Sequence, residues 1–586
     1  MTNRLQLAIL IGLALLLNLN TLFNDYSLDD IVVLVEHKYV QKGIAGIPEI
    51  LTTDLMQGYS SVENLLEQKR YRPFSLVVNA VEYQFFGANP FVSHLVNLIL
   101  FAILIFLLFK LLRDDLFKSG HPLLAFLACL FFVVHPIHTE VIASVKSRDE
   151  LITFLFLILT LINLLHWDEY GRSKNLIVGC VAFFLSLLTR ESAVTFVAVL
   201  PVVLIYFRGQ KTGTALKKSI PLLIVFVLYM VVRYSVIGLS KPMVTDVLNA
   251  PYLLASAEQA FATKVFVLLK YIWLLVFPYP LSSDYSYNQI PYIGIASFKF
   301  VLASVVLIAL AIIGVRGYQK KSVLSFSILY FFVTISLIAN FIVDIGTPLS
   351  ERLLFQASLA YCIILANLFL QLSESARKWM IYPLLVVIVL YSTQTILRNA
   401  DWKNNETLFF ADVKSAPNSA RTTLYALELY RAKAQAEQDP ALRKKYFSQA
   451  IEYGKHSLEI YPDFSITMLN LGFAYFYQGE LDSTAYYWKR GYELNKSDTE
   501  AVKCIQVVSD IYYKKGNGAS DHGDIRSAID LYKKSVDVFP EAVEAWYNLG
   551  GCYYYIGDTI AGNAAWSRVK ALDPSHEFSK KDFFLQ

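Results

Sequence analysis

The run FVSHLVNLILFAILIFLLFKL, residues 91–111, is long and apolar enough to cross a lipid bilayer as a helix. A crossing of the hydrocarbon core needs about 20 predominantly apolar residues, and Lys110 is the only charged residue in this run. Comparable runs recur up to about residue 398, with short polar loops between them. This part of the chain therefore predicts a bundle of membrane-spanning helices.

The composition of the whole chain agrees with a membrane protein. Of its 586 residues, 55% are apolar and only 17% are charged, whereas soluble domains average about 25% charged residues. A net charge of +4 is too small to indicate nucleic acid as a partner. The five cysteines form no CxxC pair and no cluster with histidine, so neither a disulfide framework nor a structural zinc site is expected.

Basic residues orient the predicted bundle. Arginine and lysine favour cytoplasmic loops, and Arg113, Arg172 and Arg208 fall in alternate loops if the N-terminus is cytoplasmic. Lysines and prolines interrupt the run 264–280. This run must be re-entrant or interfacial if the basic loops that follow it are also to lie on the cytoplasmic side. About eleven crossings remain, so the chain after residue 398 emerges on the non-cytoplasmic side. The predicted crossings are residues 5–23, 91–111, 122–138, 150–166, 175–189, 193–207, 219–237, 299–315, 322–343, 353–371 and 380–397.

Beyond residue 398 the chain carries an internal repeat. Four residues, Gly472, Tyr475, Gly479 and Trp488, return 78 positions later as Gly550, Tyr553, Gly557 and Trp566. This spacing equals a 34-residue tetratricopeptide (TPR) unit plus a second unit enlarged by about ten residues, and the polar run 516–524 is the candidate insertion. The sequence therefore predicts an all-α protein with a membrane domain over 1–398 and a TPR solenoid over 399–586.

TPR solenoids often hold an extended peptide in their groove. Tyrosines are frequent in this tail, and Tyr475, Tyr512 and Tyr553 are candidates for lining such a groove. Packing between helices is the alternative role for most of them.

An acidic pair, Asp29 and Asp30, follows the first predicted crossing in NDYSLDD, residues 24–30. Carboxylates at a membrane surface are informative because burying them is costly. Two adjacent carboxylates can act as a general base and its neighbour, since mutual repulsion and partial desolvation raise one pKa. A solvated loop or a helix N-cap is the alternative.

The loop HPIHTEVIASVKSRDE, residues 135–150, is dense in ionisable residues between two apolar runs. Arg148, with Lys146 nearby, is a candidate clamp for a phosphate group; Arg190 in TRES and Arg352 in SERLLF occupy similar positions in other outer loops. His138 and Glu140 match no standard metal-ligand spacing, so no metal is predicted. A loop whose charges satisfy one another, and interfacial snorkelling for Arg352, are the alternatives.

Motifs for other chemistries are missing from the sequence. It contains no P-loop, GxGxxG, GxSxG or HExxH pattern, which leaves ATP-driven transport and nucleophile-elbow hydrolysis without support.

Nine short stretches, taken in order with the TPR tail, resemble the transmembrane-and-TPR O-mannosyltransferases of the GT-C superfamily. The stretches are LDD 28–30, YRPF 71–74, SHLVNLILF 93–101, HPIHTE 135–140, SRDEL 147–151, TRES 189–192, LSSDYSYNQIP 281–291, SERLLF 350–355 and RNADWKNNETLF 398–409. The chain departs from that family at Ser147, where Gly is common, at Arg190, where Lys is common, and at Tyr285, where Trp is common.

This resemblance implies a GT-C-type bundle and an inverting sugar transfer on the non-cytoplasmic side, in a bacterial inner membrane or the endoplasmic reticulum. The donor would be a polyprenyl-phosphate sugar, with mannose as the expected sugar, and the acceptor a Ser or Thr hydroxyl of a protein held by the TPR groove. An acidic residue of the first outer loop acts as the base in the family, and Asp30 is preferred here over Asp29. Arg148, Arg190 and Arg352, with Lys146, His138 and Glu140, would form the donor site. The ligand spacing does not imply a metal, although some members of the family use one, so a divalent metal stays open.

Two other functions remain open. An O-antigen ligase or polymerase with a TPR tail would concentrate basic residues in a large late outer loop, whereas here the dense loops come early. A non-enzymatic TPR scaffold in the membrane would tolerate the loss of Asp29, Asp30 and Arg148.

Overall fold

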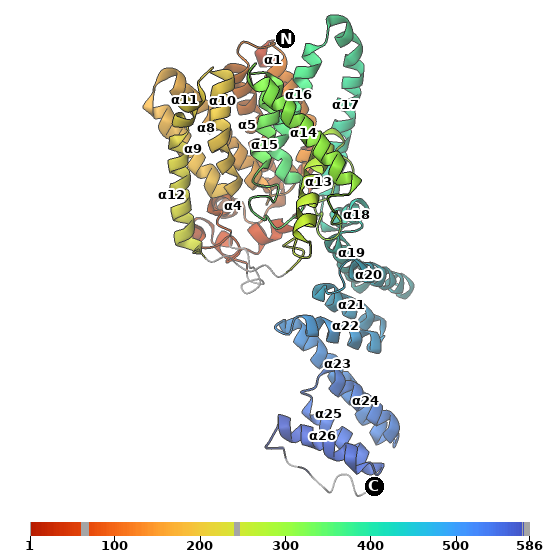
Figure 1. Cartoon of the computed structure of the whole chain (residues 1–586). Helices are drawn as coiled ribbons and strands as arrows, with labels where there is room; N and C mark the ends of the chain where they lie inside the picture. Colours follow the sequence, from red (N-terminus) through yellow and green to blue (C-terminus); the bar gives the residue numbers. More distant parts are fainter. Residues whose placement is uncertain (1, 60–69, 240–245, 577, 579–586) are drawn as a thin grey trace. The chain divides into compact units, whose positions relative to one another are not determined.

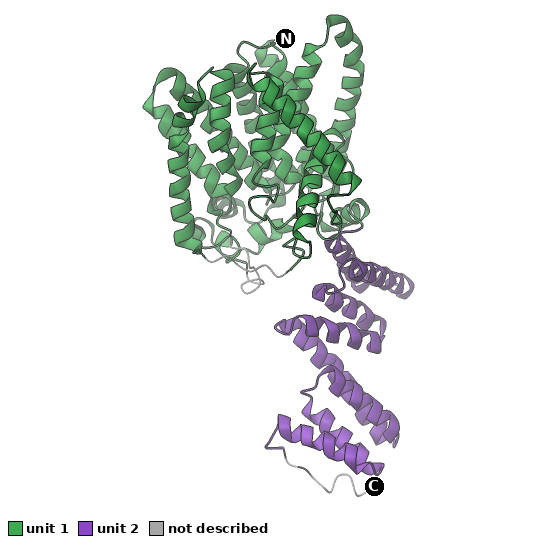
Figure 2. Cartoon of the chain, viewed as in Figure 1, with its two compact units in different colours: residues 1–417 green, residues 418–586 purple. Residues whose placement is uncertain are grey.

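The computed structural model describes residues 2–59, 70–239, 246–576 and 578, and these residues form helices with no β-strand (Figure 1). They divide into two compact units, residues 1–417 and 418–586 (Figure 2). The all-α fold predicted from the sequence is therefore confirmed.

Unit 1 is the apolar helical bundle, and its core comes mainly from α5, α6, α8, α10, α15 and α16. Its α-helices are α1 (Asn3–Leu17), α2 (Lys38–Gln41), α3 (Ile47–Thr52), α4 (Pro73–Phe86), α5 (Pro90–Lys110), α6 (Leu124–Val134), α7 (Thr139–Ala143), α8 (Arg148–Tyr170), α9 (Ser173–Thr189), α10 (Phe196–Phe207), α11 (Thr212–Lys218), α12 (Ile220–Ile237), α13 (Ala257–Val276), α14 (Phe298–Tyr318), α15 (Val323–Ile335), α16 (Leu354–Gln371), α17 (Glu374–Asp401) and α18 (Asn405–Ser415).

Each apolar run predicted as a crossing contains a helix, although the run 322–343 is an α-helix only as far as Ile335. Within the described residues, eight helices are long and apolar enough to cross a membrane, or nine if the bent pair α6–α7 counts as one span. Three of the predicted crossings correspond to apolar helices that are shorter than these eight. They are α9, the stretch Glu191–Phe207 and α15. The count of about eleven is therefore not confirmed.

The run 264–280, predicted to be re-entrant or interfacial, is helical as far as Val276, where α13 ends. Helix α13 has 20 residues and, like the other candidate spans, is long and apolar enough to cross a membrane. The sharp bend lies instead at Pro136, where the axis turns by 58° between α6 and the helices that follow. Proline lacks the N–H that would continue the helical ladder. That α13 stays on one side of the membrane remains a prediction.

Unit 2 consists of four helix pairs stacked in chain order. The pairs are α19 (Ala420–Ala436) with α20 (Pro440–Ile460), α21 (Ser465–Gln478) with α22 (Leu481–Leu494), α23 (Thr499–Asp521) with α24 (Ile525–Val538), and α25 (Val543–Tyr555) with α26 (Thr559–Leu572). This is the arrangement of TPR repeats. The extra residues lie in α23, which has 23 residues where α21 has 14 and α25 has 13. The inserted run therefore lengthens a helix.

The recurring glycines and tryptophans make the same contact in two repeats. A Cβ atom on Gly472 would lie 2.2 Å from Trp488 Cδ1, and one on Gly550 would lie 2.3 Å from Trp566 Cδ1. Each indole N–H also donates to a backbone carbonyl of the preceding helix, at 3.0 Å in both cases. The glycines are needed because the indole ring occupies the space of a side chain.

The boundary between the units lies later in the chain than the sequence analysis placed it. Helix α17 continues through residues 398 and 399 to Asp401, and Trp402 and Leu408 are buried against Ala143 of the bundle. Because these side chains complete a small core of unit 1, the division falls between residues 417 and 418.

Candidate active site

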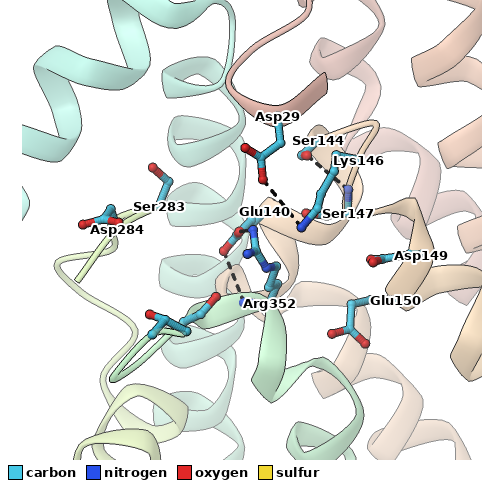
Figure 3. A network of polar contacts seen from close by, with 12 residues as sticks. Asp29, Glu140, Ser144, Lys146, Ser147, Asp149, Glu150, Ser283, Asp284 and Arg352 are labelled. Carbon is cyan, nitrogen blue, oxygen red and sulfur yellow. Dashed lines mark hydrogen bonds and ion pairs between the residues drawn. The ribbon is translucent and has the colours of Figure 1, made fainter. Parts of the chain in front are cut away.

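Ionisable side chains from four separate segments meet at one end of the bundle (Figure 3). Asp29 and Asp30 come from the segment after α1, and Lys146 comes from the turn between α7 and α8. Glu140 lies on α7, and Arg352 lies in the short 3-10 helix Glu351–Leu353 before α16. The structure thus brings together five of the eight residues of unit 1 that were selected from the sequence.

Asp30 is completely buried, and both of its carboxylate oxygens are occupied. Oδ1 accepts from Ser144 Oγ at 2.9 Å and from the backbone N–H of Lys146 at 2.7 Å, and Oδ2 accepts from the N–H of Ser27 at 3.3 Å. Burial raises the pKa of Asp30 to about 6, against the opposing effect of these hydrogen bonds. A raised pKa is typical of catalytic carboxylates, but this carboxylate is inaccessible and fixes the turn that carries Lys146.

Asp29 is the accessible member of the pair. Its side chain is 58% exposed, and its Oδ2 lies 3.6 Å from Lys146 Nζ. The Lys146 side chain is only 8% exposed. Burial lowers the pKa of Lys146 to about 8; Arg352 and Arg190 act in the same direction, while Asp29 and Asp149 oppose them.

Arg352 and Glu140 form an ion pair below Asp29 in the view of Figure 3. The Arg352 guanidinium donates to Glu140 Oε1 at 2.9 Å, and its backbone N–H donates to Oε2 at 3.2 Å. Glu140 is almost fully buried, whereas the Arg352 side chain is 24% exposed. Arg352 is therefore the accessible member of this ion pair.

Arg190 is held inside a chain of ion pairs. Its Nη1 lies 3.0 Å from Asp149 Oδ2, and its Nε lies 2.9 Å from Glu150 Oε1. Arg72 contacts the same Asp149 oxygen at 3.4 Å and Glu191 at 2.8 Å. The predicted phosphate ligand Arg190 thus has its charge balanced by two carboxylates.

Arg148 and His138 lie away from the accessible side chains. The buried Arg148 guanidinium donates to Asn97 at 2.6 Å, to Asn79 at 3.1 Å, to Glu82 at 2.7 Å and to the carbonyl of Ser93 at 2.8 Å. His138 is bonded through both ring nitrogens, to the carbonyl of Phe132 and to Ser358 Oγ, at 2.8 Å each. Both side chains hold helices together, and the geometry gives neither a free donor for a phosphate.

Arg72 is a site residue that the sequence analysis did not select. It belongs to the quoted stretch YRPF, and its charge comes between two apolar runs. No local pattern indicated that it pairs with Asp149, which lies 77 positions further along the chain.

The three tyrosines proposed for acceptor binding make contacts within unit 2. Tyr475 is buried and its ring stacks on Tyr487 at 5.5 Å between centroids. Tyr512 is buried and donates to Asp482 at 2.5 Å, and the Tyr553 ring lies under Lys533 Nζ at 5.5 Å. Acceptor binding by these side chains remains a prediction. Within the described residues, no group of three His, Cys, Asp or Glu side chains has the arrangement of a metal site.

Comparison with known proteins identifies the relatives of the chain. A protein O-mannosyl-transferase of Caenorhabditis elegans is 25% identical over 71% of this chain and 58% of its own length. The protein O-mannosyl-transferase TMTC3 of Mus musculus is 24% identical over 94% of this chain and 62% of its own, and that of Homo sapiens is 23% identical over 97% and 64%. The chain is a relative of the TMTC protein O-mannosyl-transferases. The resemblance recognised in the sequence is therefore confirmed.

The match to these relatives is partial. The chain spans about 60% of the length of these three protein O-mannosyl-transferases, and no family model matches it. Among solved structures, MamA is 20% identical over 29% of this chain and 81% of its own, with a TM-score of 0.17. YrrB, a TPR protein with an unusual peptide-binding site, is 17% identical over 32% and 83%, also with a TM-score of 0.17.

Proposed function

We propose that this membrane protein transfers mannose from a polyprenyl-phosphate donor to a Ser or Thr hydroxyl of an acceptor protein, with Asp29 as the general base. One observation carries the assignment of the base: Asp29 is the exposed carboxylate beside Lys146, whereas both oxygens of Asp30 are occupied in the interior. The names of the relatives supply the reaction class. The preference for Asp30 that came from sequence is thus replaced by Asp29.

The transfer is a single displacement at the anomeric carbon. Asp29 accepts the proton of the acceptor hydroxyl, and the hydroxyl oxygen forms a bond to C1 of the sugar. The bond between C1 and the phosphate oxygen breaks, and its electron pair leaves with the polyprenyl phosphate. Attack from the face opposite the leaving group inverts the anomeric configuration. A positioned base contributes about 10²- to 10⁴-fold to such a rate.

The leaving phosphate needs positive charge rather than a proton, because it departs ionised. Lys146 lies 3.6 Å from Asp29, and the 24% exposed Arg352 side chain also feels the Asp29 charge, so these two cations are the ones beside the accessible carboxylate. Arg148 and Arg190 are saturated by protein acceptors. The lipid phosphate is therefore assigned to Lys146 and Arg352.

The acceptor protein would be presented by unit 2 on the non-cytoplasmic side. The end of α17 lies next to the acidic pair within unit 1: the Asp25 N–H donates to the Lys403 carbonyl at 2.7 Å, and the Leu28 N–H donates to Asn405 Oδ1 at 2.8 Å. The chain thus leaves unit 1 at the same end of the bundle as Asp29. A TPR unit that follows there would share a compartment with the active site.

The test is transfer from a radiolabelled polyprenyl-phosphate mannose to a Ser/Thr-rich acceptor by the purified full chain in detergent. Asp29→Asn should reduce transfer by about 10²- to 10⁴-fold with an unchanged melting temperature. Asp344→Asn is the matched control, because Asp344 is also an exposed carboxylate (68%) with a lysine partner, Lys264. Equal transfer by the wild type and Asp29→Asn would refute the assignment of the base.

A further inference from the structure

Two lysines from neighbouring helices converge on one aromatic ring of unit 1. Lys270 lies on α13 and Lys299 lies in the first turn of α14, and these two helices pack against each other (Figure 1). The ammonium of Lys270 lies 5.9 Å from the centroid of the Phe266 ring, and that of Lys299 lies 5.6 Å from the same centroid. Both distances are within the range of a cation–π contact. Two positive charges therefore share a single ring.

The positive charge of this pair is not balanced within the protein. Among the residues that the structure describes, neither ammonium has an ion-pair or hydrogen-bond partner. Lys299 is exposed, but Lys270 is partly buried, and taking a charge out of water without a partner is unfavourable. Lys264, six positions earlier on α13, shows the usual solution, because its ammonium lies 3.4 Å from Asp344 Oδ1. Lys270 and Lys299 lack such an anion among the described residues.

Helix stability does not explain the position of Lys299. Helix α14 begins at Phe298, after the N-cap Ser297, so this lysine lies next to the positive end of the helix dipole, where a cation is disfavoured. The charge of Lys299 also acts unfavourably on the charge of Lys270. Both effects would be relieved by one anion held between the two side chains.

The surroundings of the pair are those of a surface that faces lipid. Phe261 on α13 and Phe298 and Val301 on α14 are large apolar side chains exposed on unit 1, and little of α14 is buried inside the unit. Exposed apolar surface of this kind marks a site of contact with a partner or a membrane. An anion that reaches the two lysines from this side therefore carries an apolar tail.

The depth of the pair agrees with a lipid headgroup. Helix α14 has 21 residues, which corresponds to about 30 Å, the thickness of the hydrocarbon core. Lys299 is at one end of this helix, and Arg316 is in the last turn at the other. Lysine side chains near the ends of such helices extend to the level of the headgroups. Lys299 and the neighbouring Lys270 can therefore meet the phosphate of a lipid.

We infer that Lys270 and Lys299 bind the phosphate of an anionic membrane phospholipid, whose tails lie along the exposed apolar side chains of α14. Basic sites between transmembrane helices are known to take phospholipid headgroups. The site is separate from the position assigned to the leaving phosphate, which involves Lys146 and Arg352. Because the bound phosphate bridges α13 and α14, the lipid stabilises this part of unit 1.

Lipid binding to the purified full chain in an uncharged detergent tests this inference. Dioleoyl phosphatidylglycerol is the probe, dioleoyl phosphatidylcholine is the zwitterionic comparison, and native mass spectrometry gives the Kd of the first bound lipid. The wild type should bind phosphatidylglycerol more tightly than phosphatidylcholine. Lys270→Gln and Lys299→Gln should each weaken binding of phosphatidylglycerol by about fivefold, the size expected for one lysine at an anionic lipid surface.

Matched variants separate the site from net charge and from misfolding. Lys264→Gln removes the same charge from α13, but at a lysine already balanced by Asp344, and its affinity should stay within about twofold of the wild type. Lys270→Arg keeps the charge and should keep the binding. Without lipid, Lys270→Gln should not melt below the wild type, because repulsion from Lys299 is removed. With phosphatidylglycerol, the melting temperature should rise more in the wild type than in Lys270→Gln.

Three results would overturn the inference. The first is an equal affinity of the wild type for the two phospholipids, and the second is an equal loss of affinity in Lys264→Gln and Lys270→Gln. The third is a preference of the site for polyprenyl phosphate over phosphatidylglycerol, which would assign these lysines to the donor lipid instead. Binding is measured without donor sugar or acceptor, so the lipid site and the proposed transferase can fail independently.

Discussion

The carboxylate of Asp30 accepts the backbone N–H of Lys146 at 2.7 Å, while the neighbouring Asp29 faces the ammonium group of the same lysine at 3.6 Å. One acidic residue therefore holds the turn, and the other lies beside the side chain that the turn presents. Substitution of Asp30 should therefore affect mainly the stability of unit 1, and substitution of Asp29 should affect mainly the transfer reaction.

Removal of Asp30 should destabilise unit 1. In Asp30→Ala the donors on Ser144, Lys146 and Ser27 lose their acceptor in the interior, and each unpaired buried group costs about 1–3 kcal/mol. The melting temperature of the purified protein in detergent should fall by several degrees. Asp29→Ala, at an exposed position, should melt within about one degree of the wild type; the reverse order would contradict this division of roles.

The rate of transfer should fall as the pH rises through about 8. Burial lowers the pKa of Lys146 to about 8, and the protonated ammonium is the form that stabilises a leaving phosphate. Above that pH the lysine is neutral and its contribution is lost. A pH–rate profile measures this, and Lys146→Arg should move the alkaline limb to higher pH because arginine stays protonated. An unchanged limb would show that another group titrates.

Arg148 and Arg352 should respond differently to the same substitution. Arg148→Lys keeps the charge but removes the fork that reaches Asn97, Asn79 and Glu82 in the interior, so the protein should lose stability, by about 1–3 kcal/mol for each buried acceptor left without a donor. Arg352→Lys, at a partly exposed position, should mainly reduce donor binding. Melting temperatures and KM for the donor distinguish the two, and a normal melting temperature for Arg148→Lys would be inconsistent with its buried network.

Unit 2 should be sensitive to a methyl group at the repeated glycines. A Cβ at Gly472 or Gly550 would overlap the indole of Trp488 or Trp566, and overpacking of this kind typically costs about 1–3 kcal/mol. Gly472→Ala should therefore increase the rate of limited proteolysis within unit 2. Gly518→Ala is the control, because its Cβ would meet open space within α23 and alanine favours a helix. Equal proteolysis of the two variants would contradict the packing role of the glycine.

Periodic features were predicted well because they depend on residues close in the chain. The apolar runs became helices, and the 78-residue offset located the repeats and the enlarged unit. The number of crossings was predicted less well, because hydropathy does not reveal where a helix is short, as in α15, or where Pro136 bends it. The boundary at 398 was early because the burial of Trp402 depends on a distant residue, Ala143.

Within the candidate site, the sequence selected segments that the structure brings together, but it did not distinguish the surroundings of their residues. Arg148, Arg190 and Arg352 look equivalent in the sequence, since each is a lone guanidinium beside an apolar run. In the structure, Arg148 is enclosed by acceptors and Arg190 is balanced by two carboxylates, whereas Arg352 forms an ion pair with Glu140 alone among the described residues and its side chain is 24% exposed.

The sequence by itself determined the helical membrane bundle, the TPR tail and the family of its relatives, because hydrophobic runs and repeat spacing are local properties of the chain. The tertiary structure alone decided which acidic residue is exposed and which cations lie beside it. Those properties depend on pairs far apart in sequence: Asp30 meets Ser144 across 114 positions, and Glu140 meets Arg352 across 212. Burial and charge pairing follow from such contacts, and no local pattern encodes them.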